Sequence, residues 1–464
     1  MLFSGIPFLY YFLPLFLLCF FLTPKKGRNV VLLVFSLAFY AWGEPKYVLL
    51  MVATILVGYT GGLLIARFRG RRGGKWALGI TAALLIAALG YFKYADFFIR
   101  NFNAATGLSV PLLRIALPIG ISFYTFQLLS YLIDVQRGTP VQKNLLKLAT
   151  YIALFPQLIA GPIVRYSDIS RELDERTYRV SDLAYGARRF ILGLSKKVLI
   201  ANQLGALCAV FRVSGEKSVL FYWLYAIAFM LHVYFDFSGY SDMAIGLGRV
   251  CGFHFPENFN YPFISGSITE FWRRWHMTLG SWFRDYVYIP MGGNRTSNPR
   301  RLFNLLVVWM LTGLWHGAAW NFVLWGLLFA VLLIAEKSIS GLLRGKGAWR
   351  HGYVLFFVLC SFVLFNADTL SQAAADLGGL FGAGGIPLLS APALYYLKSY
   401  GVLLVLAAVG ATPLVKIGLA KLSAHRAGSK LLSVAEPLAL SALLLVCTAY
   451  LVDGSFNPFL YFRF

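Results

Sequence analysis

Two histidines in this sequence lie where an imidazole could do chemistry. The first, His316, lies in the stretch LTGLWHGAAWNF, within a segment from Leu305 to Ala335 that contains no Asp, Glu, Lys or Arg. An ionisable side chain in so apolar a segment usually marks a reaction or transport path. The alternative is a structural histidine that donates a hydrogen bond to a carbonyl of a neighbouring helix. We interpret His316 as a functional residue.

The second histidine, His276, lies in the stretch SITEFWRRWHMTLGSWFRDYVYIPMGG. Ser267 and Glu270 have the spacing of a capping box, which predicts that a helix begins there. Apolar residues then recur at steps of three and four and predict one aromatic stripe on that helix: Trp272, Trp275, Leu279, Trp282 and Tyr286. A basic, tryptophan-rich amphipathic helix is typical of the membrane interface.

On such a helix, His276 shares a ridge with Arg273 and Gly280, so an anionic ligand could approach the imidazole closely. This ridge leads us to interpret His276 as functional. For the arginines of the stretch, contact with lipid phosphates is an equally good interpretation. Two carboxylates, Asp236 and Asp242, lie near the end of another apolar segment, where, neutralised, capped or paired, they orient a cavity or else simply cap helices.

Several catalytic signatures are missing from the sequence. The patterns GxSxG, HExxH and GxxxxGK[ST] do not occur, and the five cysteines form no CxxC or Cys/His cluster that would indicate a disulfide framework or a zinc site. The chemistry best suited to a buried imidazole without such partners is general-base catalysis on a hydroxyl. Acyl transfer from a thioester to an alcohol needs one base and donors for the developing oxyanion, and a low dielectric favours the neutral, basic form of imidazole. Ion or proton transport fits the same residues.

The elements that position these residues are membrane helices. The chain has 464 residues, of which 59% are hydrophobic and 13% charged, whereas soluble domains average about 25% charged residues. Apolar stretches near the roughly 20 residues that cross a bilayer recur from end to end. We therefore predict an all-α, polytopic integral membrane protein with about a dozen transmembrane or re-entrant helices. We predict a single domain, residues 1–464, which includes an amphipathic interfacial region at 251–301.

The segment around His316 is too long to be one straight span. From Leu305 to Ala335 a helix would extend about 46 Å, but the hydrocarbon core measures only about 30 Å. The stretch GLWHG is the natural place for a break, either in a tilted span or in a re-entrant hairpin. Non-helical backbone at this depth is tolerated only where it is buried in protein or lines a watery cavity. We therefore expect His316 to face an internal cavity.

The basic residues indicate topology and lipid contact. The formal net charge is +23, but the charges gather in short loops at 67–75, 337–350 and 416–430. This pattern is typical of loops that contact anionic lipid and argues against nucleic-acid binding. The first apolar run, Leu2 to Leu22, is followed by basic residues, which predicts a retained first span with the N-terminus on the outer side.

Five stretches together resemble the membrane-bound O-acyltransferase family. They are the His276 stretch given above, LTGLWHGAAWNFVLWG, YFDFSGYSDMAIGLG, LPIGISFYTFQLLSYLIDV and FPQLIAGPIVRY. The pairing of WHG inside a span with FWRRWH before it is highly specific in combination. The resemblance covers essentially the whole chain and is weakest after about Phe365. Within the family, the sequence is most similar to the branch that serves the O-acetylation of alginate and related exported polysaccharides.

The resemblance implies a bundle of helices around a tunnel between the two membrane faces, with His316 catalytic and His276 on the cytoplasmic side. It implies an acetyl donor such as acetyl-coenzyme A as co-substrate, no tightly bound cofactor, and a bacterial inner-membrane location. The acyl group would pass to a periplasmic partner of the SGNH-esterase type, within the polysaccharide export machinery. Residues expected to bind donor or substrate are Arg273, Arg274 and Arg284 at the donor phosphates, Trp315, Trp320 and Asn321 along the tunnel, and Asp236.

Other functions are compatible with the same residues. The acceptor could be another cell-wall glycan, such as peptidoglycan or teichoic acid. A transporter or flippase would move an acyl donor or glycolipid without forming a bond, and would tolerate replacement of His316 by Gln. A scaffold for an export complex would not need His316 at all.

Overall fold

The computed structural model describes residues 2–159, 161–338 and 347–454, and every regular element among them is a helix. Eight of these helices are long and apolar enough to cross a membrane. They are Val48–Arg67, Arg72–Thr106, Val180–Val213, Val219–Val250, Trp320–Ser338, Trp349–Asn366, Ala391–Gly410 and Arg426–Asp453. The all-helical, multi-pass membrane fold predicted from composition is therefore confirmed.

The contacts of the chain group it into two compact units. Unit 1 is Met1–Phe190 with Ser241–Pro256, and unit 2 is Ile191–Tyr240 with Glu257–Phe464. Both histidines singled out above belong to unit 2.

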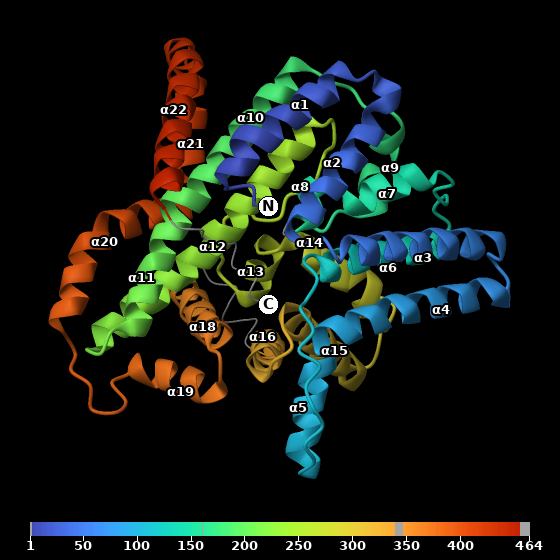
Figure 1. Ribbon diagram of the computed structural model, residues 1–464. Coiled ribbons are helices and arrows are strands. Elements are labelled where there is room, and N and C mark those ends of the chain that lie inside the picture. Colours follow the sequence, from blue (N-terminus) through green and yellow to red (C-terminus); the bar gives the residue numbers. More distant parts are fainter. Residues whose placement is uncertain (1, 160, 339–346, 455–464) are drawn as a thin grey trace. The chain divides into compact units, whose positions relative to one another are not determined.

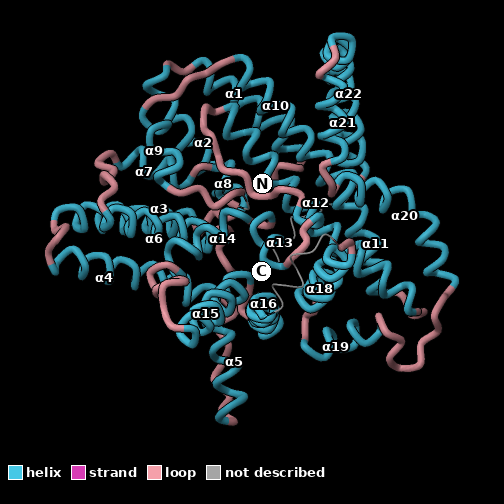
Figure 2. The backbone as a smooth tube through the Cα atoms, turned by 180° about the vertical axis from the view of Figure 1, so that it is seen from behind, coloured by secondary structure: helices cyan, strands magenta, loops and turns pink. Residues whose placement is uncertain are grey.

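Unit 1 contains the first ten α-helices. They are α1 (Leu13–Leu22), α2 (Arg28–Gly43), α3 (Val48–Arg67), α4 (Arg72–Leu89), α5 (Ala95–Thr106), α6 (Ile121–Arg137), α7 (Leu145–Ala153), α8 (Phe155–Leu158), α9 (Tyr166–Asp174) and most of α10 (Val180–Ser195). Helices α3, α4 and α6 lie side by side in both backbone views (Figures 1 and 2). Small residues allow this, because a side chain at Gly58 or Gly62 of α3 would collide with Leu128 or Tyr131 of α6.

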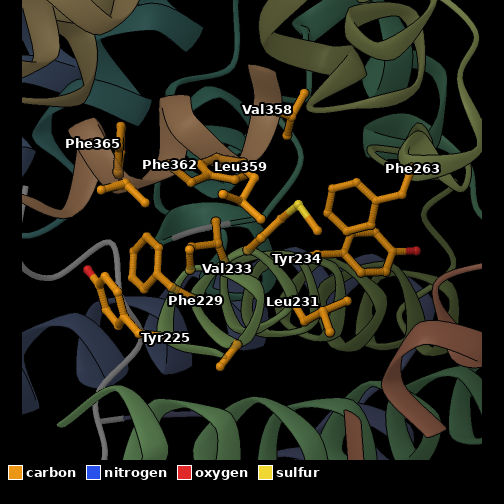
Figure 3. Close-up of a cluster of buried hydrophobic side chains, with 14 of the residues drawn as sticks. Tyr225, Phe229, Leu231, Val233, Tyr234, Phe263, Val358, Leu359, Phe362 and Phe365 are labelled. Atoms are coloured by element: carbon orange, nitrogen blue, oxygen red, sulfur yellow. The ribbon is translucent and has the colours of Figure 1, made fainter. Parts of the chain in front are cut away.

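Unit 2 starts with the end of α10 and continues through the π-helical segment η4 (Lys196–Ala201), α11 (Asn202–Val213) and most of the long helix α12 (Val219–Val250). It continues with α13 (Ile268–Arg274), α14 (Met277–Phe283), η6 (Arg284–Tyr288), α15 (Asn298–His316), α16 (Trp320–Ser338), α18 (Trp349–Asn366), α19 (Leu370–Gly379), α20 (Ala391–Gly410), α21 (Leu414–Ser423) and α22 (Arg426–Asp453). Its core is an aromatic and aliphatic cluster to which α12 and α18 contribute many of the side chains (Figure 3).

The segment that carries His316 is a helical hairpin. Helix α15 ends at His316, and α16 begins at Trp320 after a connection of three residues. A β-carbon on Gly313 would lie 2.2 Å from the carbonyl oxygen of Phe322, and one on Gly326 would lie 2.2 Å from that of Trp309. The backbones of the two helices therefore touch, and the contacts run in opposite directions along them. The predicted break at GLWHG is confirmed, and its form is a hairpin of two antiparallel helices.

Candidate functional site

The His316 ring is buried among aromatic side chains. Only 5% of the residue is exposed. The rings of Trp325 and Phe365 pack edge to face against the imidazole, with centroid distances of 5.0 and 5.3 Å and an interplanar angle of 82° in each case. The preceding residue, Trp315, lies 5.1 Å from it. Each of these rings comes from the hairpin or from the end of α18, so the position of the imidazole is set by packing within unit 2.

Asn321 fixes the end of α18 against this ring. Its Nδ2 donates hydrogen bonds to the carbonyl oxygens of Phe365 and Ala367, at 3.3 and 2.9 Å. These carbonyls belong to the end of α18, where helical partners are missing. Asn321 is buried and makes backbone contacts that hold Phe365 beside His316.

His276 does not lie on the continuous helix that the sequence pattern predicted. Helix α13 ends at Arg274, Trp275 is extended, and His276 has a left-handed backbone with φ 43° and ψ 51° before α14 begins. A helix does begin after Ser267, whose side chain accepts from the Glu270 amide at 3.0 Å. The prediction of one helical ridge through Arg273, His276 and Gly280 is nevertheless wrong.

The physical reason for the break is a segment nearby in space. The amide of Asn260 donates to the carbonyl of Arg274 at 2.9 Å, and the amide of Met277 donates to the carbonyl of Asn258 at 3.0 Å. These bonds satisfy backbone groups that a continuous helix would have paired within itself. A left-handed conformation is uncommon for a residue other than glycine, and such outliers gather at functional sites.

Asn258 also determines which nitrogen of His276 carries the proton. The backbone amide of Thr278 can only donate, and it reaches the Asn258 side-chain oxygen Oδ1 at 3.3 Å. The Thr278 hydroxyl reaches the same oxygen at 2.8 Å, and His276 Nδ1 reaches it at 3.1 Å. Since Oδ1 is an acceptor, Nδ1 donates to it. The lone pair of the neutral ring is therefore on Nε2.

The surroundings keep that ring neutral. His276 is 1% exposed, and Phe237 of α12 meets it edge to face with centroids 4.6 Å apart. His276 lies outside the membrane-spanning helices, and its burial lowers its pKa to about 3. At neutral pH, Nε2 is thus a hydrogen-bond acceptor or a base.

The structure brings the two sequence-predicted histidines together. The ring centroids of His276 and His316 lie 6.5 Å apart, and Trp315 contacts both rings, at 5.8 and 5.1 Å. Two imidazoles inside an aromatic enclosure can accept a proton from a hydroxyl and return it to a leaving group. Chemically, this arrangement suits acyl transfer.

The three candidate arginines have different surroundings. Arg274 pairs with Glu270 at 2.9 Å and donates to the carbonyl of Asn260. Arg284 is exposed and pairs with the adjacent Asp285, whereas Arg273 is exposed at the end of α13. Among the expected tunnel residues, Trp320 is half exposed at the start of α16.

Asp236 forms a buried ion pair that sequence reasoning had not assigned. Its carboxylate lies 2.5 Å from Lys197 Nζ, and both side chains are 2% exposed or less. One turn away on the same two helices, His232 Nδ1 lies 2.7 Å from the carbonyl oxygen of Ala201. These contacts join η4 to α12. The signal in the sequence was a lysine within an apolar span, since such a charge requires a partner. Asp242, in unit 1, pairs in a similar way with Arg189 at 2.7 Å.

Glu336, like Lys197, is a residue that the sequence analysis missed. It lies near the end of α16 and is buried. Its carboxylate accepts hydrogen bonds from the backbone amides of Ile268 and Thr269 and from the Thr269 hydroxyl. A carboxylate at this position satisfies the free amides at the start of α13 and stabilises its dipole. Glu336 thereby positions the short helix that leads to His276.

Comparisons with known proteins identify the family to which the chain belongs. Residues 139–370 match the model of the membrane-bound O-acyltransferase family, a range that includes both histidines. The chain is 42% identical over 394 residues to a probable alginate O-acetylase from Azotobacter vinelandii, covering 83% of this chain and 79% of that protein. It is 34% identical over 432 residues to a peptidoglycan O-acetyltransferase from Helicobacter pylori, covering 84% and 81%. A teichoic acid D-alanyltransferase from Bacillus subtilis is 33% identical over 229 residues, or 46% of this chain and 58% of that protein.

Proposed function

Since this chain belongs to the membrane-bound O-acyltransferase family, we propose that it supplies the acetyl group for O-acetylation of an exported polysaccharide such as alginate. The family assignment makes the chain an O-acyltransferase, which favours bond formation over the transporter alternative. The acetyl group and the alginate-like acceptor are supported by the similarity to probable alginate O-acetylases over most of both chains.

The observation that carries the proposed mechanism is the contact between two buried histidines in an aromatic enclosure. His316 acts as the general base. It takes the proton of the accepting hydroxyl while that oxygen attacks the carbonyl carbon of the acetyl thioester. The carbonyl electron pair moves onto oxygen, returns, and expels the thiolate. The imidazolium then protonates the thiolate, so an ester and a free thiol are the products.

His276 assists from the donor side. Its Nε2 is a neutral acceptor next to His316, so it can relay a proton or hold a donor group in place. The donor is acetyl-coenzyme A from the cytoplasm, and the exposed Arg273 and Arg284 provide positive charge for its phosphates. The location is the bacterial inner membrane, with the N-terminus periplasmic. A periplasmic partner of the SGNH-esterase type completes transfer to the polysaccharide.

The experiment that tests this function follows the acetyl label. The purified chain in proteoliposomes receives acetyl-coenzyme A labelled in the acetyl group, together with an alginate oligosaccharide and a periplasmic extract. Thioester loss and labelled ester are expected with the wild-type chain, and His316→Ala should leave less than a few per cent of both. His425→Ala is the matched control, because His425 is exposed and makes no side-chain cap at the start of α22.

Two results would contradict the proposal. Retained acetylation in a folded His316→Ala protein would remove His316 from the mechanism. Label that reaches the far side of the membrane without any new ester would identify a transporter.

A second acceptor requires a parallel assay, because 84% of this chain aligns with a peptidoglycan O-acetyltransferase. Ester formed on peptidoglycan fragments but not on alginate would assign the chain to that acceptor.

A further inference from the structure

A buried indole N–H next to His316 has no hydrogen-bond partner. Trp325 lies on α16 and is 2% exposed. Its Nε1 is inaccessible to solvent and contacts no acceptor among the residues that the structure describes. Buried polar groups in proteins are nearly always hydrogen-bonded, and an exception calls for an explanation, such as a catalytic role. Leaving such a donor unsatisfied costs about 1–3 kcal/mol of stability.

The neighbours of Trp325 explain why its donor has no partner within the protein. Its ring packs against Phe329, Phe365 and Trp272, at centroid distances of 5.2, 5.2 and 5.7 Å. None of these side chains carries an oxygen. Among the ring contacts of Trp325 that the described residues make, the fourth is with the imidazole of His316, at 5.0 Å. The indole that carries the unsatisfied donor therefore lies in the same aromatic enclosure as the proposed base.

The backbone holds this donor and the base in fixed relation. His316 is the last residue of α15, and Trp325 lies on the facing helix α16. The adjacent Gly326 touches the backbone of Trp309 so closely that a β-carbon would lie 2.2 Å from its carbonyl oxygen. The two helices cannot shift independently at this level. Preorganised donors of this kind stabilise charge in a transition state without a cost of reorganisation.

We propose that Trp325 is a catalytic residue whose Nε1–H donates a hydrogen bond to the carbonyl oxygen of the acyl group. This role rests on the proposed function. As the hydroxyl oxygen bonds to the carbonyl carbon and its proton moves to His316, the π electron pair of the carbonyl moves onto oxygen. The indole N–H binds that oxyanion. When the pair returns and the carbon–sulfur bond breaks, the thiolate leaves and takes the proton from His316.

Trp272 provides an internal comparison. Its Nε1 is also inaccessible and has no acceptor among the described residues. Its ring, however, packs on Trp309, Trp325 and Phe329, so it lies one ring further from His316. Of the two indoles, only Trp325 is in ring contact with the proposed base in this description of the chain.

The test removes one N–H and leaves the rest of the ring. Replacing Trp325 by β-(3-benzothienyl)alanine exchanges the indole N–H for sulfur and keeps the bicyclic shape, and Trp325→Phe is the simpler companion. Loss of one oxyanion donor lowers kcat by about 100-fold or more. We expect that loss for both variants in the acetyl-coenzyme A assay, with KM for the donor unchanged, because the bond forms only in the transition state. The same benzothienyl replacement at Trp272 should keep kcat within about threefold.

The outcomes separate this role from packing and from the proposed function. If the benzothienyl variant at position 325 retains wild-type kcat, the role is overturned, even if Trp325→Phe is inactive or misfolded. A rise in KM with kcat unchanged also overturns it. In both cases the proposed function still stands, provided that acetyl transfer by the wild-type chain depends on His316. If the wild-type chain transfers no acetyl group at all, the proposed function is wrong. The role of Trp325, which rests on that function, is then wrong as well.

Discussion

The imidazole rings of His276 and His316 lie 6.5 Å apart, inclined at 65° to each other, although they come from different elements of unit 2. At this separation one oxygen atom can bridge the two rings, so a single reacting hydroxyl or carbonyl can be in contact with both. The two residues should therefore act on the same step, and their replacement should not have independent effects.

We predict non-additive losses in a pair of histidine variants. His316→Ala should abolish acetyl transfer, and His276→Ala should reduce it by at least tenfold. The double variant should be no less active than His316→Ala alone. When two residues act together on one step, removing either already removes their joint contribution to the rate. Initial rates of thioester loss measure this. Expression and membrane insertion of His276→Ala should stay near wild type. If acetyl transfer and expression fell by the same factor, His276 would have a structural role instead.

The low pKa of His276 predicts a stability that declines in acid. The unfolded chain binds a proton at this histidine near pH 6.5, whereas burial lowers the pKa of the folded residue to about 3. Between these values the unfolded state binds more protons, so stability is complete above pH 6.5 and falls as the pH drops toward 3. At pH 5 the loss amounts to about 2 kcal/mol. Thermal unfolding at pH 8 and pH 5 should show a steeper decline in wild type than in His276→Asn.

Asn258 should be needed for both stability and rate. Asn258→Ala removes the acceptor for His276 Nδ1 and for the amide and hydroxyl of Thr278. Each buried donor left unsatisfied costs about 1–3 kcal/mol, and the imidazole loses the bond that fixes its tautomer. The unfolding midpoint and kcat should both fall. Asn294→Ala is the matched control, since Asn294 is exposed and its side-chain oxygen accepts a hydrogen bond from the Tyr288 hydroxyl. Equal behaviour of the two variants would contradict the assigned role.

The hairpin glycines should tolerate no side chain. Gly313→Ala and Gly326→Ala each place a β-carbon 2.2 Å from a backbone oxygen of the opposite helix. The helices must separate to relieve this contact, which displaces His316 and Trp325. We expect destabilisation of at least about 1–3 kcal/mol, typical of overpacking, and a loss of activity. Gly401→Ala in α20 has open space around the new methyl group and should be neutral in the same unfolding and activity assays.

The buried pair Lys197–Asp236 should serve stability more than chemistry. Removing one partner leaves a buried charge uncompensated, at a cost of about 3–5 kcal/mol. The double variant Lys197→Met with Asp236→Leu should regain much of that loss. A double-mutant cycle on unfolding midpoints measures the coupling. If the double variant is stable but inactive, Asp236 binds substrate or donor, as expected from the sequence.

The sequence predicted the features that follow from composition and chain length. The break at GLWHG followed from a segment too long for the bilayer, and the hairpin confirms it. The break at Trp275 and His276 could not be predicted in this way, because no glycine or proline interrupts the helical spacing there. It depends on Asn258 and Asn260, which take over backbone hydrogen bonds through tertiary contact. The partners Lys197 and Glu336 were missed for the same reason, since pairing between helices leaves no periodic signal.

The direct backbone contact between α15 and α16 also bears on how reactants reach the imidazole. Where Gly313 and Gly326 bring the two backbones into contact, the helices cannot move relative to each other without losing this packing. We therefore expect the hairpin to move as one rigid unit. Opening must then come from its surroundings, which include Phe365 of α18, 5.3 Å from the imidazole and held in place by the Asn321 amide. If the imidazole acts as proposed, its access to reactants would accordingly depend on motion at the end of α18, because α15 and α16 are held against each other.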